Sequence, residues 1–341
     1  MSRPVVLSRR LLLTGSLSAA LVGGLVGCNS SASTEASDDV GATEQTVFPV
    51  TVTHKYGDTI VPAEPKRVVV VGYTEQDILL ALGVAPVATR EWYGDQPYAV
   101  WPWATDELGD AKPEVIKAPD NLPLEQIAAL TPDLIIGTNA GLEKAVYDSL
   151  TKIAPTIANS GKYGSDWFEP WPDQTLLVGK AVGKEKEAQQ LVDDLTKRFA
   201  DEAAAHPQFA EVPAIFLQAP YYEGSAIAYQ DGLSTEFLTD LGFVIPKELT
   251  PFARDEAQAY IPVEKLDVLN AGDVLIWATE DDKAKTELEK NKLFGQLDAV
   301  KAGRSLYTGG ELAGALYFST VLSLPFVLDQ LVPELEKALP A

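Results

Sequence analysis

Cysteine, histidine and methionine are almost absent from this sequence of 341 residues, which has one cysteine, two histidines and one methionine. A single cysteine excludes a disulfide bond within the chain. His54 and His206 lie far apart along the chain, and each is interpreted as a surface histidine. A transition metal bound directly by protein needs several clustered His, Cys or carboxylate ligands. We therefore expect neither a metal site nor a resident cofactor.

Positive charge is also scarce. Lys and Arg number 27 against 49 Asp and Glu, so the net charge is −22. Such an acidic surface repels phosphate backbones, which excludes nucleic-acid binding. Signatures of catalysis are missing too, because the sequence has no Gly-x-Ser-x-Gly elbow and no phosphate-binding loop. The sequence accordingly predicts a protein that is not an enzyme.

Residues 1–27 are predicted to be a lipoprotein signal peptide. Three arginines precede a moderately apolar run over residues 11–26, which is the order of a secretory signal. The run ends at Leu25-Val26-Gly27-Cys28, which resembles the bacterial lipobox. That resemblance implies that Cys28 is acylated and anchors the mature chain in the lipid membrane, on the outer face of the cytoplasmic membrane.

The export route stays open between two pathways. Ser8-Arg9-Arg10-Leu11-Leu12 resembles a twin-arginine motif, whereas ordinary signals also carry paired arginines. No later apolar run reaches about 18 residues, so no further membrane span is predicted. Residues 28–46 are mostly small, polar or acidic, and a segment of this composition is expected to be a flexible tether.

The rest of the chain is predicted to form two α/β lobes, because its length indicates about two domains. A continuous β-branched run at residues 67–72 indicates a buried strand, and helical spacing follows it from Glu75 to Leu82. Residues 185–205 carry one apolar face without Gly or Pro, which predicts a helix of about 21 residues between the lobes. The predicted parts are an N-terminal lobe over 47–183, the interlobe helix over 184–206 and a C-terminal lobe over 207–341.

An internal echo indicates that the two lobes share one plan. Residues 122–136 and 261–276 both contain Pro-apolar-Glu, a short amphipathic helix, a turn and a buried strand. A weaker echo pairs Leu82-Gly83-Val84 with Leu241-Gly242-Phe243. Such repetition is typical of α/β proteins built from two related halves.

The order and spacing of these features resemble the iron–siderophore and vitamin B12 class of bacterial periplasmic binding proteins, the actinobacterial lipoproteins in particular. Besides the lipobox and the long helix, the segments that carry the resemblance are Pro65-Lys66-Arg67-Val68-Val69, Leu82-Gly83-Val84, Arg90-Glu91-Trp92-Tyr93, Leu124-Glu125-Gln126-Ile127 and Val263-Glu264-Lys265-Leu266. The resemblance implies two α/β lobes joined by one rigid helix. It also implies a monomer that captures a ferric siderophore and delivers it to ABC permease subunits and their ATPase. Glu125 and Glu264 would dock on the transporter, and ferric iron would enter only as the siderophore complex.

Aromatic side chains gather in segments that resemble loops. Trp92, Tyr93, Tyr98, Trp101 and Trp103 form one group, Trp167, Phe168 and Trp171 a second, and Tyr221-Tyr222 a third. Aromatic residues in loops either pack locally or line a ligand surface, and both interpretations stay open for Trp101, Trp103 and Trp171. The candidate ligand-binding residues are Tyr73, Arg90, Trp92, Tyr93, Lys162, Trp167, Tyr221, Tyr222 and Arg254.

The scarcity of cations also bears on the ligand. Arg90, Lys162 and Arg254 lie near aromatic residues and are candidates to hydrogen-bond an oxygen of an iron-bound hydroxamate or carboxylate. No arginine cluster is visible to balance a triply anionic catecholate complex, so we expect a neutral or cationic siderophore of hydroxamate or mixed type. Other ligands and functions stay open: haem, with Tyr221 or Tyr222 as candidate axial ligand, cobalamin, a lipid-anchored extracytoplasmic hydrolase with two carboxylates, or a ligand-sensing lipoprotein.

Overall fold

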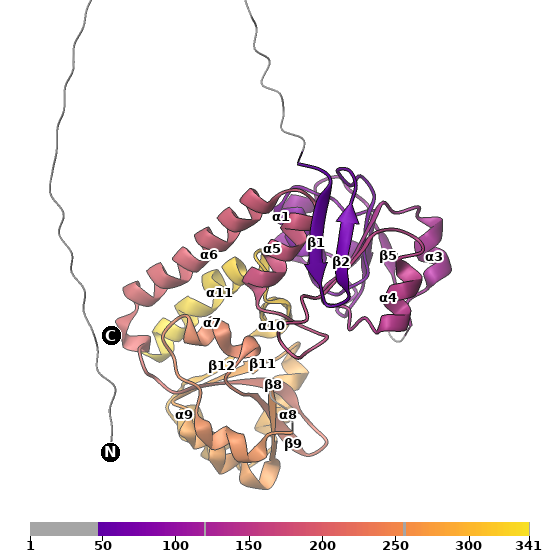
Figure 1. Cartoon of the computed structure of the whole chain (residues 1–341). Helices are drawn as coiled ribbons and strands as arrows, with labels where there is room; N and C mark the ends of the chain where they lie inside the picture. Colours follow the sequence, from indigo (N-terminus) through magenta and orange to yellow (C-terminus); the bar gives the residue numbers. More distant parts are fainter. Residues whose placement is uncertain (1–46, 119–120, 255–256, 341) are drawn as a thin grey trace, which may run out of the picture. The chain divides into compact units, whose positions relative to one another are not determined.

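The protein is described by a computed structural model over residues 47–118, 121–254 and 257–340 (Figure 1). Cys28, the signal peptide and the tether lie outside these residues. Within them, no helix is both long enough and apolar enough to cross a membrane. The described part opens with an antiparallel hairpin of β1 (Val50–His54) and β2 (Gly57–Val61).

His54 ends β1 and is buried, so its interpretation as a surface histidine is wrong. The alternation of the strand turns Val52 and His54 inward, and His54 is only 4% exposed. Its Nε2 lies 2.9 Å from the Thr59 hydroxyl, and its ring packs edge-on against Tyr147 at a centroid distance of 5.3 Å. Burial lowers the pKa of His54. The hairpin is thereby attached to the first lobe.

The first lobe is built on a parallel sheet of five strands in the order β5-β4-β3-β6-β7. Its central strands consist of fully buried apolar residues, as expected for a parallel sheet covered on both faces. The strands are β3 (Val68–Val70), β4 (Ala88–Arg90), β5 (Glu114–Ile116), β6 (Leu134–Gly137) and β7 (Thr156–Ala158). The helices are α1 (Glu75–Ala81), α2 (Thr105–Leu108), α3 (Leu124–Ala129), α4 (Lys144–Leu150) and α5 (Trp171–Ala181).

The second lobe has a five-stranded sheet in the order β10-β9-β8-β11-β12. Its strands are β8 (Ala214–Tyr222), β9 (Ser225–Tyr229), β10 (Gln258–Pro262), β11 (Val274–Ala278) and β12 (Ser305–Tyr307). Its α-helices before the C-terminal segment are α7 (Glu236–Thr239), α8 (Asp282–Glu289) and α9 (Asp298–Lys301). The short 3-10 helices of the chain are η1 (Pro97–Ala99), η2 (Pro102–Ala104), η3 (Pro207–Phe209), η4 (Leu233–Thr235), η5 (Lys247–Phe252), η6 (Val263–Ala271) and η7 (Phe294–Gln296).

The two sheets confirm the internal echo. The two strand orders match position by position when five is added to each strand number of the first sheet. The central strand β3 of the first sheet thus corresponds to β8 of the second, and β6 corresponds to β11. The repeated segment is α3 with β6 in one lobe and η6 with β11 in the other. The lobes differ at β9, which pairs antiparallel with β8 through a tight turn, whereas β4 is parallel to β3. Val244 directly follows the second copy of the weaker echo. It forms a parallel bridge with Pro213, which precedes β8, and this bridge resembles the parallel pairing of β4 with β3.

The predicted long helix is confirmed as α6 (Glu185–Ala205), and its 21 residues span about 30 Å. It buries one apolar face formed by Ala188, Val192, Leu195 and Phe199. Figure 1 shows α6 leaving the region of α5 and running past the C-terminal helix toward the second sheet. The fold therefore consists of two α/β lobes joined by a single long helix, as the sequence predicts.

The C-terminal segment contains α10 (Gly309–Phe318) and α11 (Ser323–Ala338), and it contacts both lobes. The carboxylate of Asp77 on α1 accepts hydrogen bonds from the Thr320 hydroxyl at 2.6 Å and from the Trp103 indole at 2.8 Å. One hydrophobic core runs from β3 and α1 through α6 and α11 to β8 and β11. The chain thus returns to the first lobe after completing the second sheet. The predicted boundaries of the two lobes, at residues 183 and 207, stay a prediction.

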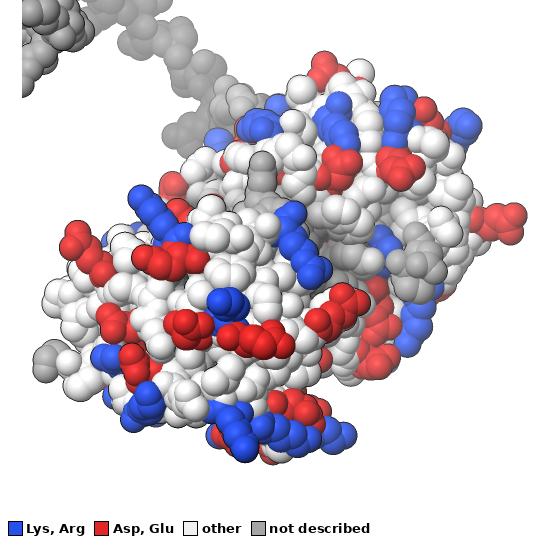
Figure 2. Space-filling model, turned by 90° about the horizontal axis from the view of Figure 1, so that it is seen from below, with Lys and Arg blue, Asp and Glu red and all other residues white. Residues whose placement is uncertain are grey.

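Charged side chains of both signs are mixed on the surface. Figure 2 shows one face of the molecule, on which Lys and Arg lie among Asp and Glu. Several of the ion pairs join neighbours on one helix, as Lys197 and Asp201 do on α6 and Lys285 and Glu289 do on α8. Exposed pairs of this kind contribute little to stability. The fold therefore depends mainly on its buried apolar core.

Candidate functional site

Two adjoining cavities lie where segments of both lobes meet. The first has a volume of about 270 Å³, and its wall combines Trp92 and Phe168 of the first lobe with β8, β9 and α10. The second, of about 560 Å³, lies between residues 163–168 and residues 230–234. Phe168, Leu233, Ser234 and Ala257 line both cavities, so we treat them as one cleft. Its size falls within the range of small-molecule sites.

The wall of the first cavity is aromatic and acidic. Seven of its lining residues are aromatic: Trp92, Phe168, Trp171, Phe216, Tyr229, Tyr317 and Phe318. The charged residues in this wall are Glu169 and Glu236, and no described residue that lines either cavity is Lys or Arg. Among the residues with assigned positions, no group of three His, Cys, Asp or Glu side chains could hold a metal ion.

An aromatic stack borders the cleft on the side of the first lobe. Tyr73 stacks with Trp92 at a centroid distance of 5.5 Å and an interplanar angle of 18°, and with Trp167 at 5.5 Å and 12°. Gly141 makes the second contact possible, because a Cβ atom at this position would lie 2.2 Å from the Trp167 ring. The stack keeps broad apolar faces at the edge of the cleft, where planar or apolar parts of a ligand pack favourably.

Arg90 supports this stack from within the first lobe. Its guanidinium carbon lies 4.3 Å from the centroid of the Tyr73 ring, a cation–π contact. The side chain is buried and donates hydrogen bonds to the carbonyl of Ala118 at 2.6 and 3.1 Å and to that of Val71 at 3.2 Å. Burial lowers the pKa of Arg90, which the nearby Tyr73 and Glu75 partly offset. Arg90 thus ties together the ends of three chain segments and does not line either cavity.

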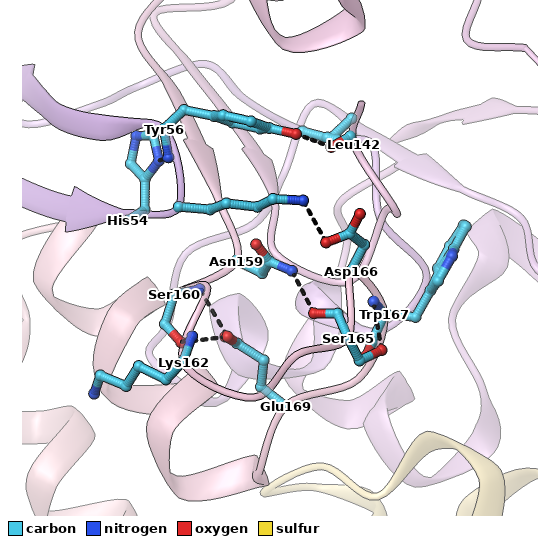
Figure 3. A network of polar contacts seen from close by, with 11 residues as sticks. His54, Tyr56, Leu142, Asn159, Ser160, Lys162, Ser165, Asp166, Trp167 and Glu169 are labelled. Atoms are coloured by element: carbon cyan, nitrogen blue, oxygen red, sulfur yellow. Dashed lines mark hydrogen bonds and ion pairs between the residues drawn. The ribbon is translucent and has the colours of Figure 1, made fainter. Parts of the chain in front are cut away.

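Residues 159–170, which we call the aromatic loop, carry Trp167 and Phe168 into the cleft. Lys55 pairs with Asp166 of the loop. Figure 3 shows further polar contacts that hold the loop: the Asn159 amide donates to the Ser165 carbonyl at 3.0 Å, and Ser160 donates to Glu169. Phe168 has a positive φ of 50°, and its backbone N–H donates to the Asn139 side chain at 3.1 Å. Strained backbone of this kind persists only where the surroundings fix it.

A buried carboxylate lies close to the aromatic loop. Glu75 opens α1 and is fully buried, and its oxygens accept hydrogen bonds from the Asn139 N–H at 2.7 Å, the Thr74 N–H at 3.1 Å and the Thr138 hydroxyl at 3.2 Å. Burial raises its pKa, while these hydrogen bonds act in the opposite direction. Because Asn139 in turn holds Phe168, Glu75 links the ends of β3 and β6 to the wall of the cleft. Sequence reasoning assigned Glu75 only to a helix start.

Comparison with known proteins identifies the family. The model of a family described as periplasmic binding protein matches residues 68–312. The chain belongs to the periplasmic binding protein family. A Bacillus subtilis (strain 168) relative, the probable siderophore-binding lipoprotein YfiY, is 30% identical over 296 residues, which cover 82% of this chain and 85% of the relative.

Two crystal structures resemble this binding protein. A periplasmic solute-binding protein from Mycobacterium smegmatis is 43% identical, with a TM-score of 0.79 over 85% of this chain and 98% of the other. Streptococcus pneumoniae PiaA in complex with ferrichrome is 28% identical, with a TM-score of 0.71 over the same shares. The fold and its two-lobed plan are therefore those of solute-binding proteins.

The binding protein brings together part of the predicted ligand-binding set. Tyr73, Trp92 and Trp167 form the stack at the cleft. Tyr93 packs edge-on against Trp92 at 5.2 Å, and its buried hydroxyl has no hydrogen-bond partner among the described residues. Trp101 and Trp103 stack on each other at 5.0 Å, and neither lines either cavity, which favours the local-packing alternative for both. Trp171 lines the first cavity.

The other predicted ligand-binding residues lie outside the two cavities. Lys162 is exposed and pairs with Asp173 at 3.4 Å. Arg254 is exposed, with its guanidinium 4.0 Å from the centroid of the Tyr260 ring. Tyr221 packs edge-on against Trp277 in the core of the second lobe, and Tyr222 is 55% exposed. Their contact with a ligand stays a prediction, and the cleft geometry does not support it.

Sequence reasoning missed several residues of the cleft wall. Tyr317 and Phe318 come from α10, where their apolar neighbours predict an ordinary core helix. Glu169 and Glu236 are single acids among 49 and carry no motif. The one sequence feature that points to Glu169 is the aromatic pair Trp167-Phe168 directly before it, which marks this segment as a candidate ligand surface. The predicted docking residues, Glu125 and Glu264, are exposed at the second positions of α3 and η6.

Proposed function

We propose that this periplasmic binding protein captures a ferric siderophore of the hydroxamate or mixed type in its cleft and delivers it to an ABC importer. The observation that carries the proposal is the wall of the cleft, which joins seven aromatic residues from both lobes and contains no Lys or Arg among its described residues. The siderophore already fills the coordination sphere of iron, so the protein needs surfaces that pack against the organic shell and no ligands to the metal.

The charge of the cleft separates the siderophore classes. A ferric tris-catecholate carries three negative charges, and Glu169 and Glu236 would repel it. A ferric tris-hydroxamate is neutral and suits an acidic, aromatic wall. The relative crystallised with ferrichrome, a complex of this type, supports the same choice.

Haem is less well suited to the cleft. Tyr221 and Tyr222, the candidate axial ligands, lie outside the two cavities. The tyrosines that line the first cavity are Tyr229 and Tyr317, and burial raises the pKa of both phenols, that of Tyr229 to about 12. A tyrosine that ligates haem iron does so as the phenolate, which burial disfavours.

Delivery is proposed to depend on Cys28, Glu125 and Glu264. Acylation of Cys28 would hold the protein at the outer face of the cytoplasmic membrane, next to the permease subunits and their ATPase. Glu125 and Glu264 occupy matching positions of the repeated lobes, and both side chains are exposed. Each helix precedes a parallel strand and therefore begins near the carboxyl edge of its sheet, where α/β proteins bind their ligands. Two exposed acids, one per lobe, would suit basic residues on two permease subunits.

The test is a tryptophan fluorescence titration of the purified protein. Trp92 and Trp171 line the cleft, so a ferric complex bound there should quench them with one-to-one stoichiometry at submicromolar concentration. The panel contains ferrichrome, ferrioxamine B, a ferric tris-catecholate, haemin and cyanocobalamin. Tight quenching by the tris-catecholate without a response to either hydroxamate would contradict the proposal. Turnover of a ligand without stoichiometric quenching would favour the hydrolase alternative.

A further inference from the structure

Glu169 has a carboxylate oxygen that is buried in the wall of the cleft without a partner. The residue is only 6% exposed. Its Oε1 accepts hydrogen bonds from the backbone N–H of Ser160 at 2.7 Å and from the Ser160 hydroxyl. Its Oε2 has no hydrogen-bond partner among the described residues. An unpaired polar atom in a buried position costs free energy, and an ionised one costs more. A donor brought by a ligand would remove that cost.

Glu236 faces the same cavity from the other lobe. It opens α7, lines the first cavity and makes no ion pair with any residue in the described ranges. Among the described residues, the charges that affect the two carboxyls are Asp240 for Glu236, and Asp173 and Lys162 for Glu169. Lys162 is itself paired with Asp173 and is exposed to solvent. Burial raises the pKa of both glutamates, and no described cation within the cleft compensates them.

The charges of both glutamates affect the same residue of the cleft, Tyr163. Tyr163 lines the second cavity, and its pKa rises to about 12, mainly through its hydrogen bond to Asp173. The charges of Glu169 and of Glu236 contribute to the same increase, although the residues come from different lobes. The aromatic rings around them, Trp92 and Phe168 among them, also attract a cation through their faces.

We propose that Glu169 and Glu236 form a cation subsite that selects ferric siderophores with a free ammonium group remote from the iron. This inference rests on the proposed function and names the ligand class more narrowly. The ammonium group donates to Oε2 of Glu169 and lies near the Glu236 carboxylate, while the neutral ferric hydroxamate core packs against the aromatic wall. A charge-assisted hydrogen bond in a partly desolvated cleft is stronger than one in water.

The test compares two ligands that differ in one charge. Ferrioxamine B has a terminal ammonium group, and N-acetylated ferrioxamine B has the same ferric core without that charge. Both are titrated by tryptophan quenching against the wild-type protein, Glu169→Gln, Glu236→Gln, the double variant, and Glu187→Gln as a control on the exposed face of α6. The side-chain amide introduced by Glu169→Gln keeps an oxygen that can accept from Ser160, so the aromatic loop should stay folded. Thermal unfolding of each variant verifies this.

We expect the wild-type protein and Glu187→Gln to bind ferrioxamine B at least about 10-fold more tightly than the acetylated ligand. In the double variant this ratio should fall to about one, with the affinity for the acetylated ligand unchanged. Equal affinity of the wild-type protein for the two ligands would overturn the cation subsite but leave the proposed function intact. A ratio that persists in the folded double variant would also overturn it. Binding of neither ligand would overturn this inference, and the titration with ferrichrome, a hydroxamate complex without an ammonium group, would then decide the proposed function separately.

Discussion

Asp77 offers a quantitative test of how the C-terminal segment is attached to the first lobe. The residue is fully buried, and its Oδ2 accepts hydrogen bonds from Trp103 and Thr320, while its Oδ1 has no partner among the described residues. Burial raises its pKa from 3.8 to about 6, although the two hydrogen bonds oppose the increase. The folded protein therefore binds more protons than the unfolded chain between these two values, and the free energy of unfolding falls as the pH rises through this window.

The magnitude follows from the size of the shift. A difference of about two pKa units corresponds to about 3 kcal/mol in total, at about 1.4 kcal/mol per unit. Because the unfolded carboxyl is already mostly ionised at about pH 4.5, about 2 kcal/mol of this falls between about pH 4.5 and 7.5. Asp77→Asn keeps an acceptor for Trp103 and Thr320 but does not titrate. Relative to wild type, the variant should gain about 2 kcal/mol of unfolding free energy over that range.

The assay is urea unfolding of both proteins at several pH values, followed by tryptophan fluorescence. Glu75, Glu169, Glu236 and Asp240, whose pKa values burial also raises, are present in both proteins and cancel in the difference. Asp106→Asn, at an exposed position of α2, controls for the loss of one carboxylate from the protein. Parallel pH dependences of wild type and Asp77→Asn would contradict this account, because they would show that Asp77 titrates alike in the folded and unfolded chains.

Three further predictions concern the ligand and the transporter. Trp92→Ala should weaken binding of the preferred hydroxamate complex by about 1–3 kcal/mol in the quenching titration, and unchanged affinity would remove Trp92 from the site. Gly141→Ala should displace Trp167 from Tyr73, since the new methyl group would meet the indole at 2.2 Å. The expected result is a lower affinity of about 5-fold or more with the fold retained, and wild-type affinity would argue against the role of the stack. Glu125→Arg combined with Glu264→Arg should abolish uptake without changing ligand affinity, each single change being partly defective. Normal uptake by the double variant at wild-type abundance would show that these glutamates only stabilise helix starts.

Features that depend on local periodicity and on order along the chain could be predicted from the sequence alone. The apolar face between residues 185 and 205 predicted α6, because helix period and length are properties of one continuous segment. The echo between residues 122–136 and 261–276 predicted the shared plan, since each copy repeats the same local pattern and then pairs with the central strand of its own sheet. The clustering of aromatic residues in loops likewise indicated Trp92 and Trp167 as candidates for the ligand-binding surface, and both line the cleft.

Which of the candidates meet at the cleft depends on tertiary packing. Tyr221 and Tyr229 follow each other closely in the chain, yet the first is partly buried against the core of the second lobe and the second lines the cavity. Their strands are the two arms of the β8–β9 hairpin, which has a register shift beyond Gln218. The direction in which each side chain points is therefore set by strand pairing. Asp77 meets Thr320 across 243 positions, and Glu169 and Glu236 reach one cavity from different lobes. Such contacts leave no local pattern, because packing of distant segments brings them together.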